Sequence, residues 1–537
     1  MLGPGNSDTR YPGTSTRYME TKVTTGNPTY DEFYPGIKNF LEQDQVTYTI
    51  DGERVHGYRS PDCNALWLRD HSDILRGARY FEEDMLSGIS HFAKTQRTNG
   101  SIFDFVSCAM DRENWTKYVR VPVEADVEYR FVKAIFLGWQ ATGDDDWLAW
   151  ILPHAEKAMQ YSMSHPWRWC REHGLIKRAY TIDTWDFDYL GSEQAWLNFQ
   201  VSDRTHWGIF HGDNSGFYEA CRLMAKFYHH LGKQKKQGFW VTIADKIRQR
   251  TNELCWNGRF YTHRVPLDDF HIPDVDEAAQ LSLSNPMAIN RGLATHEMAV
   301  AVIREYQQRR AKTDTFAEWF SIDPPFPDGC FGDPKLIQGA YVNGGIMPLV
   351  GGELARAAFD HGFEAYGLSI LQQYARMIQE TGATYLWYFP NGTPSSAKTS
   401  TSPEATPTDG WGSSAMLFAF MEGLVGVVDA DYLFRKVRLS PRWCITSIHQ
   451  AQVQVKYGAS EGYLRYDFQY DSEQCRLIVD GDGEIQLHLL LPDGKRAKKV
   501  RVDNIALTFQ NVSVESSSYV DAEFCINGRA TLDVIFE

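Results

Sequence analysis

The chain has 537 residues and a formal net charge of −15. Its length allows more than one domain, and its acidic balance, without any Lys/Arg-rich run, argues against nucleic acid or an anionic membrane as a partner. No stretch of about 18 apolar residues predicts a spanning helix, and residues 1–23 lack the apolar core of a secretory signal. Nine cysteines without a Cys-x-x-Cys pair indicate reduced thiols, so a cytoplasmic protein is expected.

The first 60 residues read as irregular chain with short extended pieces. Residues 46–50 followed by Asp51-Gly52 predict a hairpin. From Asp73 onward, apolar residues recur at helical spacings of three and four as far as Phe92. The same periodicity predicts helices over 126–139, 147–163, 217–231, 239–256, 295–308, 351–362, 364–380 and 413–424.

Helices therefore recur in pairs through the middle of the chain, and no repeat of solenoid length is present. A closed ring of helix pairs is the arrangement that fits this pattern. The pattern changes near Val427 to short alternating segments with Asp-Gly turns, which predict a C-terminal antiparallel β-sandwich. Asp480-Gly481-Asp482-Gly483 is interpreted as a hairpin turn rather than a calcium loop, because the ligand spacing and the terminal Glu are missing.

The segment Asp183-Thr184-Trp185-Asp186-Phe187-Asp188-Tyr189 alternates carboxylates with bulky side chains. A carboxyl group between Trp185 and Phe187 loses water, so its pKa should rise and the group can act as a general acid. Aromatic walls also suit the C–H faces of sugars. The alternative is a structural turn with solvated aspartates.

A second candidate region runs from Glu380 to Trp411. It is a long stretch that holds Trp387 and a Ser/Thr/Pro-rich loop with Glu404, and Asp409 lies just before its end. Loops of this length between helices are usually functional or disordered, and the aromatic residues at both ends favour function. Glu404, Glu380 and Asp409 are the candidate general bases across the sugar from the acid.

Three further patterns bear on function. Arg69-Asp70, just before the first helical stretch, offers donors and acceptors for vicinal sugar hydroxyls, with a solvated ion pair as the alternative. Gly212-Asp213-Asn214-Ser215-Gly216 is interpreted as a helix start with a buried Asp/Asn network, because a phosphate loop would end in Lys-Ser/Thr. The histidine and cysteine spacings predict no metal site, and no cofactor is expected.

These residues resemble the six-hairpin glycosidases, a group that includes trehalase, processing α-glucosidase, mannosylglycerate-type hydrolases, glucoamylase and α-rhamnosidase. Trp67-Leu68-Arg69-Asp70 is similar to the motif that lines the terminal-sugar pocket in glucoamylase-like enzymes. Trp185-Asp186-Phe187 is similar to the segment that carries the general acid. Tyr341-Val342-Asn343-Gly344-Gly345 and the stretch from Asp409 to Ser413 resemble two further segments of the group.

The resemblance covers about residues 60–435. It implies a mainly α fold with an (α/α)6 barrel over 61–435, after an extended N-terminal segment 1–60 and before a β-sandwich over 436–537. It also implies Asp186 as the general acid. Relatives carry their base near a Glu-x-Tyr pattern, whereas Leu386-Trp387-Tyr388 has no Glu, so Glu404 becomes the favoured base.

The resulting hypothesis is an inverting, exo-acting glycoside hydrolase with a carbohydrate substrate, and the sequence is compatible with a homo-oligomer. The predicted substrate-binding residues are Arg69, Asp70, Trp185, Asn343, Trp387 and Trp411. One rival is a glycoside phosphorylase, in which Gly412-Ser413-Ser414 cradles phosphate. The other rival is a carbohydrate-binding protein without turnover.

Overall fold

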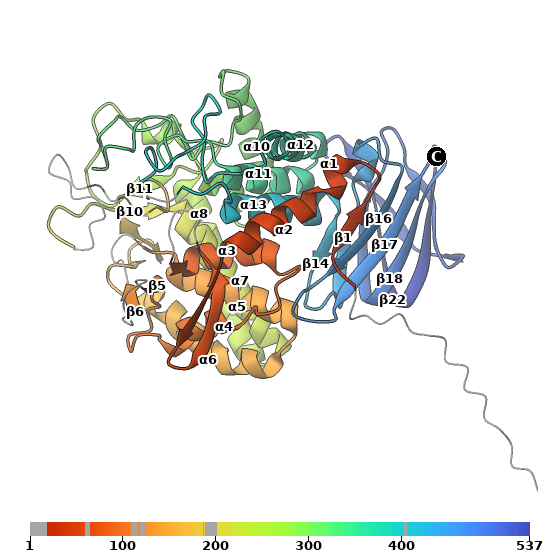
Figure 1. The fold of residues 1–537 in the computed structure, drawn as a ribbon, viewed down its shortest axis with the longest axis horizontal. Coiled ribbons are helices and arrows are strands. Elements are labelled where there is room, and N and C mark those ends of the chain that lie inside the picture. Colours follow the sequence, from red (N-terminus) through yellow and green to blue (C-terminus); the bar gives the residue numbers. More distant parts are fainter. Residues whose placement is uncertain are drawn as a thin grey trace, which may run out of the picture.

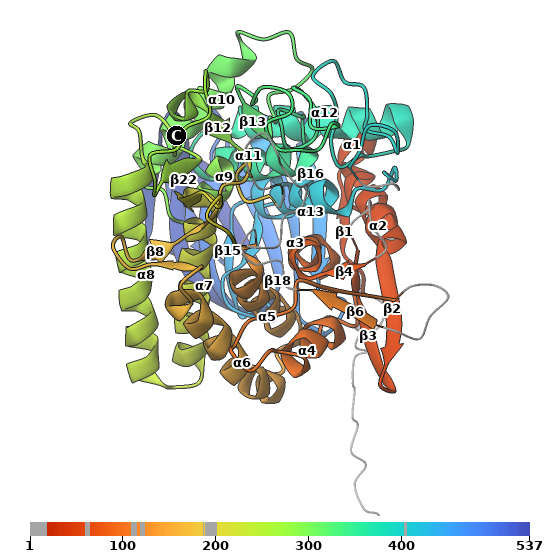
Figure 2. The ribbon, with the colours of Figure 1, turned by 90° about the vertical axis from the view of Figure 1, so that its left-hand side faces the viewer.

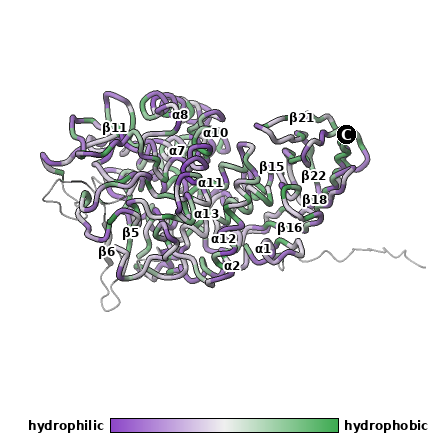
Figure 3. Tube along the Cα trace, turned by 90° about the horizontal axis from the view of Figure 1, so that it is seen from above, coloured by the Kyte–Doolittle hydropathy of each residue, from purple (hydrophilic) through white to green (hydrophobic). Residues whose placement is uncertain are grey.

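A helical body packs against one large, mostly antiparallel sheet (Figure 1). The computed structural model describes residues 19–59, 65–108, 115–118, 124–185, 187, 189, 201–401 and 405–537. Seen from above, the helical body and the sheet lie next to each other (Figure 3).

Six helices of the described chain contact one another in a cyclic order, in which α3 is followed by α5, α7, α9, α11 and α13, and α13 contacts α3 again. Figure 2 shows them around a common centre. We call this set the inner ring. Its members are α3 (Leu68–Ala78), α5 (Val127–Thr142), α7 (His211–His230), α9 (Ser284–Asn290), α11 (Pro348–Asp360) and α13 (Gly410–Phe418).

A second set of helices covers the inner ring from outside. In this outer set α6 contacts α5, α8 contacts α7, α10 contacts α9, α12 contacts α11, and α2 contacts α13, while α4 lies against α5 and α6. The short helix α1 (Pro28–Asp31) precedes α2. The bounds are α2 (Phe33–Gln43), α4 (Ser87–Lys94), α6 (Asp145–Ser164), α8 (Gln234–Cys255), α10 (His296–Arg310) and α12 (Glu364–Thr381).

Glycine allows two inner helices to approach closely. A Cβ atom on Gly352 of α11 would lie 2.4 Å from the carbonyl carbon of Ala415 in α13. A Cβ atom on Gly412 of α13 would lie 2.5 Å from the Pro348 side chain at the start of α11. The backbones of α11 and α13 therefore touch where a larger residue would hold them apart.

The large sheet has ten strands, with the order β1-β16-β17-β18-β22-β19-β20 along its main path. The longest strands, β18 and β22, pair along the whole of β18. Off the main path, β15 pairs with β18, β14 pairs with β15, and β21 pairs with β22. The bounds are β1 (Lys22–Thr24), β14 (Val427–Asp429), β15 (Lys436–Leu439), β16 (Gln450–Lys456), β17 (Tyr463–Tyr470), β18 (Gln474–Leu490), β19 (Ala497–Val502), β20 (Ile505–Ala506), β21 (Phe509–Val514) and β22 (Ser517–Phe536).

Small sheets decorate the helical body. The hairpin of β2 and β3 is the largest two-stranded unit among them, and the others connect loops near the ends of the helices. The bounds are β2 (Gln45–Ile50), β3 (Glu53–Tyr58), β4 (Leu66–Trp67), β5 (Phe105–Cys108), β6 (Trp115–Tyr118), β7 (Trp169–Cys170), β8 (Leu175–Ile176), β9 (Arg178–Ala179), β10 (Trp207–Phe210), β11 (Arg264–Pro266), β12 (Leu281–Ser282) and β13 (Ile322–Asp323). Single turns of other helix types are η2 (Glu277–Ala279), η3 (Ala419–Leu424) and η4 (Trp443–Ile445).

Several predicted elements are confirmed. The hairpin at Asp51-Gly52 joins β2 to β3, and both residues have positive φ angles of 54° and 80°, as a tight two-residue turn requires. The helices predicted over 126–139, 147–163, 217–231, 239–256, 295–308, 351–362 and 364–380 correspond to α5, α6, α7, α8, α10, α11 and α12.

Three predictions are wrong. The helix expected from Asp73 begins at Leu68 and ends at Ala78, so Arg69-Asp70 lies inside a helix. Every residue of α3 is buried, and this removes the contrast between a polar and an apolar face on which the periodicity depends. Segment 480–483 is no turn, because β18 runs straight through it. The N-terminal 60 residues are not purely extended, since α2 lies there.

The sheet also differs in detail from a sandwich of separate sheets. Its strands form one hydrogen-bonded sheet, because β18 and β22 belong to both halves. Gly483 of β18 lies against Arg435, the residue just before β15. A Cβ atom on Gly483 would be 2.3 Å from the Arg435 carbonyl oxygen. Gly483, one of the two glycines that suggested a turn, therefore allows close approach between β18 and its neighbour.

Candidate active site

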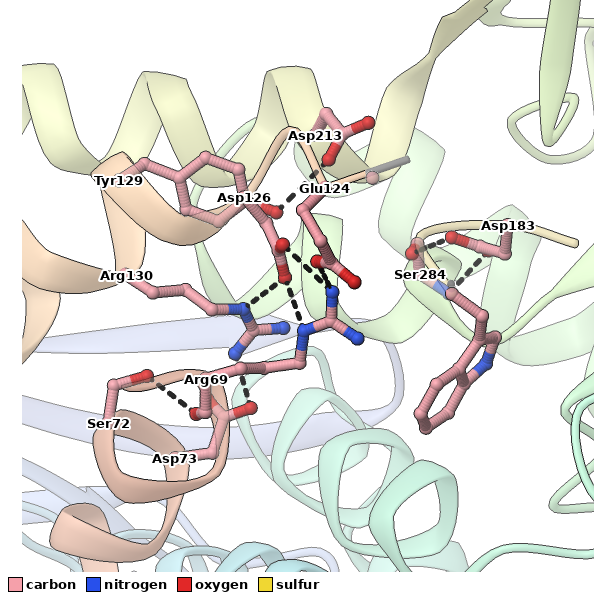
Figure 4. Close-up of polar contacts among 12 residues, drawn as sticks. Arg69, Ser72, Asp73, Glu124, Asp126, Tyr129, Arg130, Asp183, Asp213 and Ser284 are labelled. Atoms are coloured by element: carbon pink, nitrogen blue, oxygen red, sulfur yellow. Dashed lines mark hydrogen bonds and ion pairs between the residues drawn. The ribbon is translucent and has the colours of Figure 1, made fainter. Parts of the chain in front are cut away.

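The N-terminal ends of the inner helices bring the predicted polar residues together. Arg69 and Asp73 lie in the first turns of α3, Asp126 directly precedes α5, Asp213 lies in the first turn of α7, and Trp411 lies in that of α13. Figure 4 shows Arg69, Asp73, Asp126 and Asp213 around one centre. Since these helices are neighbours in the ring, residues far apart in sequence meet at one end of it.

The guanidinium group of Arg69 is held by two buried carboxylates. It donates to Asp126 at 3.0 Å and is also bonded to Glu124 (Figure 4). Asp126 is in turn bonded to Arg130 at 2.7 Å. Burial alone would raise the pKa of Asp126, but Arg69 and Arg130 outweigh it and lower that pKa to about 2. Contact between Arg69 and sugar hydroxyls stays a prediction.

Asp73 joins this ion-pair network to the aromatic part of the site. Its carboxylate binds Arg130 and accepts a hydrogen bond of 2.6 Å from the Trp411 indole nitrogen. Burial raises the pKa of Asp73, but Arg130 and Arg76 outweigh burial and hold that pKa below its ordinary value. Asp73 is therefore a fixed negative charge that orients Trp411.

Asp70 differs from Asp73 although both lie near the start of α3. It is buried, and burial raises its pKa to about 7 despite the opposing effect of Arg69. The negative charges of Asp73 and Asp104 raise it further. Asp70 is thus a carboxyl group that holds a proton close to neutral pH and can donate a hydrogen bond.

Three predicted tryptophans lie in one chain of ring contacts. Trp185 meets Trp411 edge-to-face, with ring centroids 5.2 Å apart, and lies 5.2 Å from Tyr341. Tyr341 lies 6.2 Å from Trp387. All three tryptophans are buried. This cluster places buried aromatic rings beside Asp73, which Trp411 contacts, and stacking of a sugar on these rings stays a prediction.

Asn343 builds the loop that carries Tyr341. Its side chain accepts from the backbone N–H of Phe326 at 2.7 Å and donates to the carbonyl oxygens of Phe326 and Leu336 at 3.0 Å each. Tyr341 itself has a φ of 46°, an uncommon conformation for a residue with a side chain. The described contacts of Asn343 are therefore within the loop, and its contact with substrate stays a prediction.

The chain around Trp185 is anchored from two sides. Asp183 binds the first residue of α9, accepting from the Ser284 hydroxyl at 2.5 Å and from its N–H at 3.3 Å (Figure 4). Arg178 binds the Trp185 carbonyl oxygen and lies 3.3 Å from Asp213. Burial raises the pKa of Asp183, but His211 and the serine hydroxyls outweigh it and hold that pKa below its ordinary value.

Asp183 is thus an ionised anchor rather than an acid. Asp186 and Asp188, the other two carboxylates of the motif, lie outside the described residues, as does Glu404.

The two alternative bases have different surroundings. Asp409 caps α13, because its carboxylate oxygens accept from the N–H groups of Trp411 at 3.0 Å and Gly412 at 2.9 Å. Glu380 lies exposed in the last turn of α12. The described geometry gives Asp409 a structural role, and a role for either residue as base stays a prediction.

The segment proposed as a phosphate cradle is filled by helix packing. The Ser414 hydroxyl donates to the Asp73 carbonyl oxygen at 2.9 Å and accepts from the Gly77 N–H at 2.9 Å. The Ser413 hydroxyl binds the Asp409 carbonyl oxygen and lies 2.9 Å from the Tyr374 hydroxyl. Both serines are fully buried, which disfavours phosphate binding there.

In the part of the chain that the structure describes, no group of three or more His, Cys, Asp or Glu side chains is arranged to hold a metal ion. Among the described helices, none combines the length and apolar character needed to cross a membrane.

Comparison with known proteins identifies the fold. No protein family model matches the chain, and no curated protein matches its sequence. An α-L-rhamnosidase from Dictyoglumus thermophilum aligns with a TM-score of 0.60 at 12% identity, over 96% of this chain and 50% of that protein. The Streptomyces avermitilis α-L-rhamnosidase in complex with L-rhamnose gives 0.59 at 13%, over 96% and 42%. A structure named as a sialidase gives 0.60 at 11%, over 95% and 41%.

At these identities the likeness shows a shared fold. The chain spans half or less of the length of those three proteins. The resemblance to a group that includes α-rhamnosidases is confirmed at this level.

Sequence reasoning missed the partners of the predicted residues. Glu124, Asp126 and Arg130 were not singled out, although Asp126 stands at a predicted helix start. Their signal was the presence of charged residues in and just before a strongly apolar helix, because such residues are buried only when they are paired. Tyr341 belonged to a noted motif, but its contact with Trp185 depends on loop geometry.

Proposed function

We propose that this chain is an exo-acting glycoside hydrolase that inverts the anomeric centre and removes a terminal sugar from an oligosaccharide or small glycoside. We take the inner ring and its outer helices to form the (α/α)6 barrel that the resemblance implies. The cyclic contacts among the helices and the shared fold with α-L-rhamnosidases support this view.

The observation that carries the proposal is the contact between Trp185 and Trp411 beside the buried carboxyl groups of α3. Trp185 directly precedes Asp186 in the sequence, and its carbonyl oxygen is fixed by Arg178. An aromatic wall next to anchored carboxyl groups is the combination that sugar binding and acid catalysis require.

In the proposed mechanism Asp186 protonates the glycosidic oxygen and Glu404 activates a water molecule on the opposite face of the sugar. An inverting enzyme holds these groups roughly 6.5–9.5 Å apart, because the water must fit between them. Asp70, Trp185 and Trp411 contact the terminal sugar, and the Arg69–Asp126–Arg130 network holds their supporting helices in place.

Screening aryl-glycosides and disaccharides, with NMR of the released anomer, tests the reaction. We expect Asp186→Asn to lower kcat/KM by roughly 10²–10⁴-fold, because general acid catalysis contributes about that much. The loss should be much smaller for an activated leaving group such as dinitrophenolate, which needs no proton. Asp188→Asn is the matched control, and an equal loss in both variants would contradict the assignment.

Glu404→Gln and Glu380→Gln separate the candidate bases. We expect the first change to abolish turnover on all leaving groups, and the second, at an exposed helix end, to leave kcat/KM unchanged. Product formation that requires inorganic phosphate would indicate a phosphorylase instead. Sugar binding without any turnover would indicate a binding protein.

A further inference from the structure

A small cavity lies among the helices of the inner ring, and each of the six contributes to its wall. Helices α3, α5, α7 and α11 supply charged side chains, α9 supplies Met287 and Asn290, and α13 supplies Phe418. The cavity volume is about 50 Å³. That is room for a few water-sized particles, because one needs roughly 10–15 Å³.

The wall of this cavity carries more cations than anions. Its carboxylates are Asp73, Glu219 and Glu353, and its cations are Arg76, Arg130, Lys133 and Arg291. Asp126, which also binds Arg130, lies outside the wall and is shared with Arg69. Among the residues of the wall alone, cations therefore outnumber carboxylates by one, and Asp126 offsets part of this excess from outside the wall.

Each carboxylate already has a close cationic partner. Asp73 binds Arg130, Glu219 binds Lys133, and Glu353 binds Arg76 at 2.5 Å. Arg291 lies 3.8 Å from Glu219. The other polar contacts of Arg291 are with the uncharged Gly212 carbonyl and Ser215 hydroxyl. The excess charge thus lies with Arg291, on the wall of the cavity.

Arg76 supplies an unused donor. One terminal nitrogen, Nη1, binds Glu353, and Nε donates to the Asp73 carbonyl oxygen at 3.3 Å. The other terminal nitrogen, Nη2, is buried and has no hydrogen-bond partner among the described residues, while the whole residue is 8% exposed. A buried charged donor without a partner is costly, so a ligand that accepts from it is favoured.

We infer that this cavity is a binding site for one small monovalent anion of the halide class, chloride under ordinary ionic conditions. Arg76 Nη2 donates to the anion, and Arg291 balances its charge. The small volume favours a compact anion over larger polyatomic ones. The inference is independent of the proposed glycosidase activity, because it rests on the cavity alone.

Thermal unfolding in different sodium salts tests the site. The unmodified protein is placed in sodium gluconate, which is then replaced by chloride or bromide at constant ionic strength. We expect a saturable rise in Tm with both halides, because a ligand that binds only the folded state stabilises it by mass action. Equal Tm values in all three salts would overturn the inference.

Crystals grown in bromide give a second test that needs no variant. The anomalous signal should place bromide beside Arg76 within the cavity. Bromide bound only at the outer surface, or water alone in the cavity, would refute the site.

A matched pair of variants assigns the effect to Arg76. Arg76→Gln should abolish the halide-dependent rise in Tm. Arg356→Gln is the control, because Arg356 is also buried and its guanidinium lies 5.3 Å from the Phe418 ring, compared with 5.1 Å for Arg76, yet it does not line the cavity. A response that persists in Arg76→Gln, or is lost in Arg356→Gln, contradicts the inference. Arg291→Gln replaces the first variant if Arg76→Gln does not fold.

Discussion

Asp70 and Asp73 lie three positions apart in α3, and burial raises the pKa of both, but their partners move the two values in opposite directions. Asp73 has Arg130 and the Trp411 indole N–H as direct partners, and these stabilise its charge. The nearby positive charge of Arg69 lowers the pKa of Asp70, but the Arg69 guanidinium is already bound by Glu124 and Asp126. The buried charge of Asp70 is therefore poorly compensated, and the protonated form is favoured.

This difference predicts how stability depends on pH. The pKa of Asp70 rises from 3.8 to about 7 on folding, so well below pH 3.8 the group is protonated in both states and does not affect stability. As pH rises from about 4 to 7 the unfolded chain ionises first, and the folded state loses relative stability. Asp70→Asn removes this loss and should be more stable than the parent above pH 7 by a few kcal/mol, since one pKa unit is about 1.4 kcal/mol.

Chemical denaturation of both proteins from pH 4 to 8 measures the effect. The advantage of Asp70→Asn should grow through this window and then level off. A difference that is constant with pH would show that Asp70 is ionised throughout. Asp73→Asn, whose pKa is lowered in the folded state, should instead be less stable than the parent above pH 4.

At the scale of helices, exposure decides what the sequence can predict. Helices of the outer set have one solvent-facing side, and their apolar periodicity predicted α6, α8, α10 and α12. The inner helices α3 and α9 are buried on nearly every side, so the predicted start of α3 is too late and the short α9 is missed. Apolar content alone does not locate such helices.

The residues of the candidate site also fall into those that the sequence predicts and those that it does not. Trp185 and Trp411 were predicted because each stands in a short local motif. The ion pairs of Arg69 with Glu124 and of Arg130 with Asp73 join residues more than fifty positions apart. Such pairs follow from the order of helices around the ring, which periodicity does not reveal.

The crossing of α11 and α13 gives a prediction about helix packing. Gly352→Ala places a methyl group 2.4 Å from the backbone of Ala415, which cannot move without shifting the helix. We expect the free energy of unfolding to fall by about 1–3 kcal/mol, as overpacking usually costs.

Gly238→Ala is the control for that change. Gly238 lies on the exposed side of α8, and a Cβ atom there would meet nothing within 4 Å. This substitution should raise the free energy of unfolding by about 0.4–1 kcal/mol through chain entropy and helix propensity. A loss of stability at both positions, measured by urea denaturation, would show that the α11–α13 contact is not the cause.

At the scale of the whole molecule, the N-terminal segment ties the helical body to the sheet. Strand β1 pairs with β16 at the sheet edge (Figure 1), and α2, which follows it, packs on α13. The Thr21 hydroxyl donates to the Lys456 carbonyl oxygen at 2.9 Å and accepts from its N–H at 2.9 Å. Val23, in the centre of β1, is buried.

Removal of β1 should therefore weaken the link between the helical body and the sheet, and make β16 an exposed edge strand. Deletion of residues 1–24 leaves β16 with unpaired backbone groups, and such edges promote association between sheets. We expect the free energy of unfolding to fall by roughly 2–4 kcal/mol, the sum of one buried valine and a few hydrogen bonds. Size-exclusion chromatography should show a concentration-dependent increase in apparent mass. Deletion of residues 1–18 removes none of these contacts and is the control. An equal fall in the free energy of unfolding in the two truncated proteins would place the stabilising contacts before Thr21 rather than in β1.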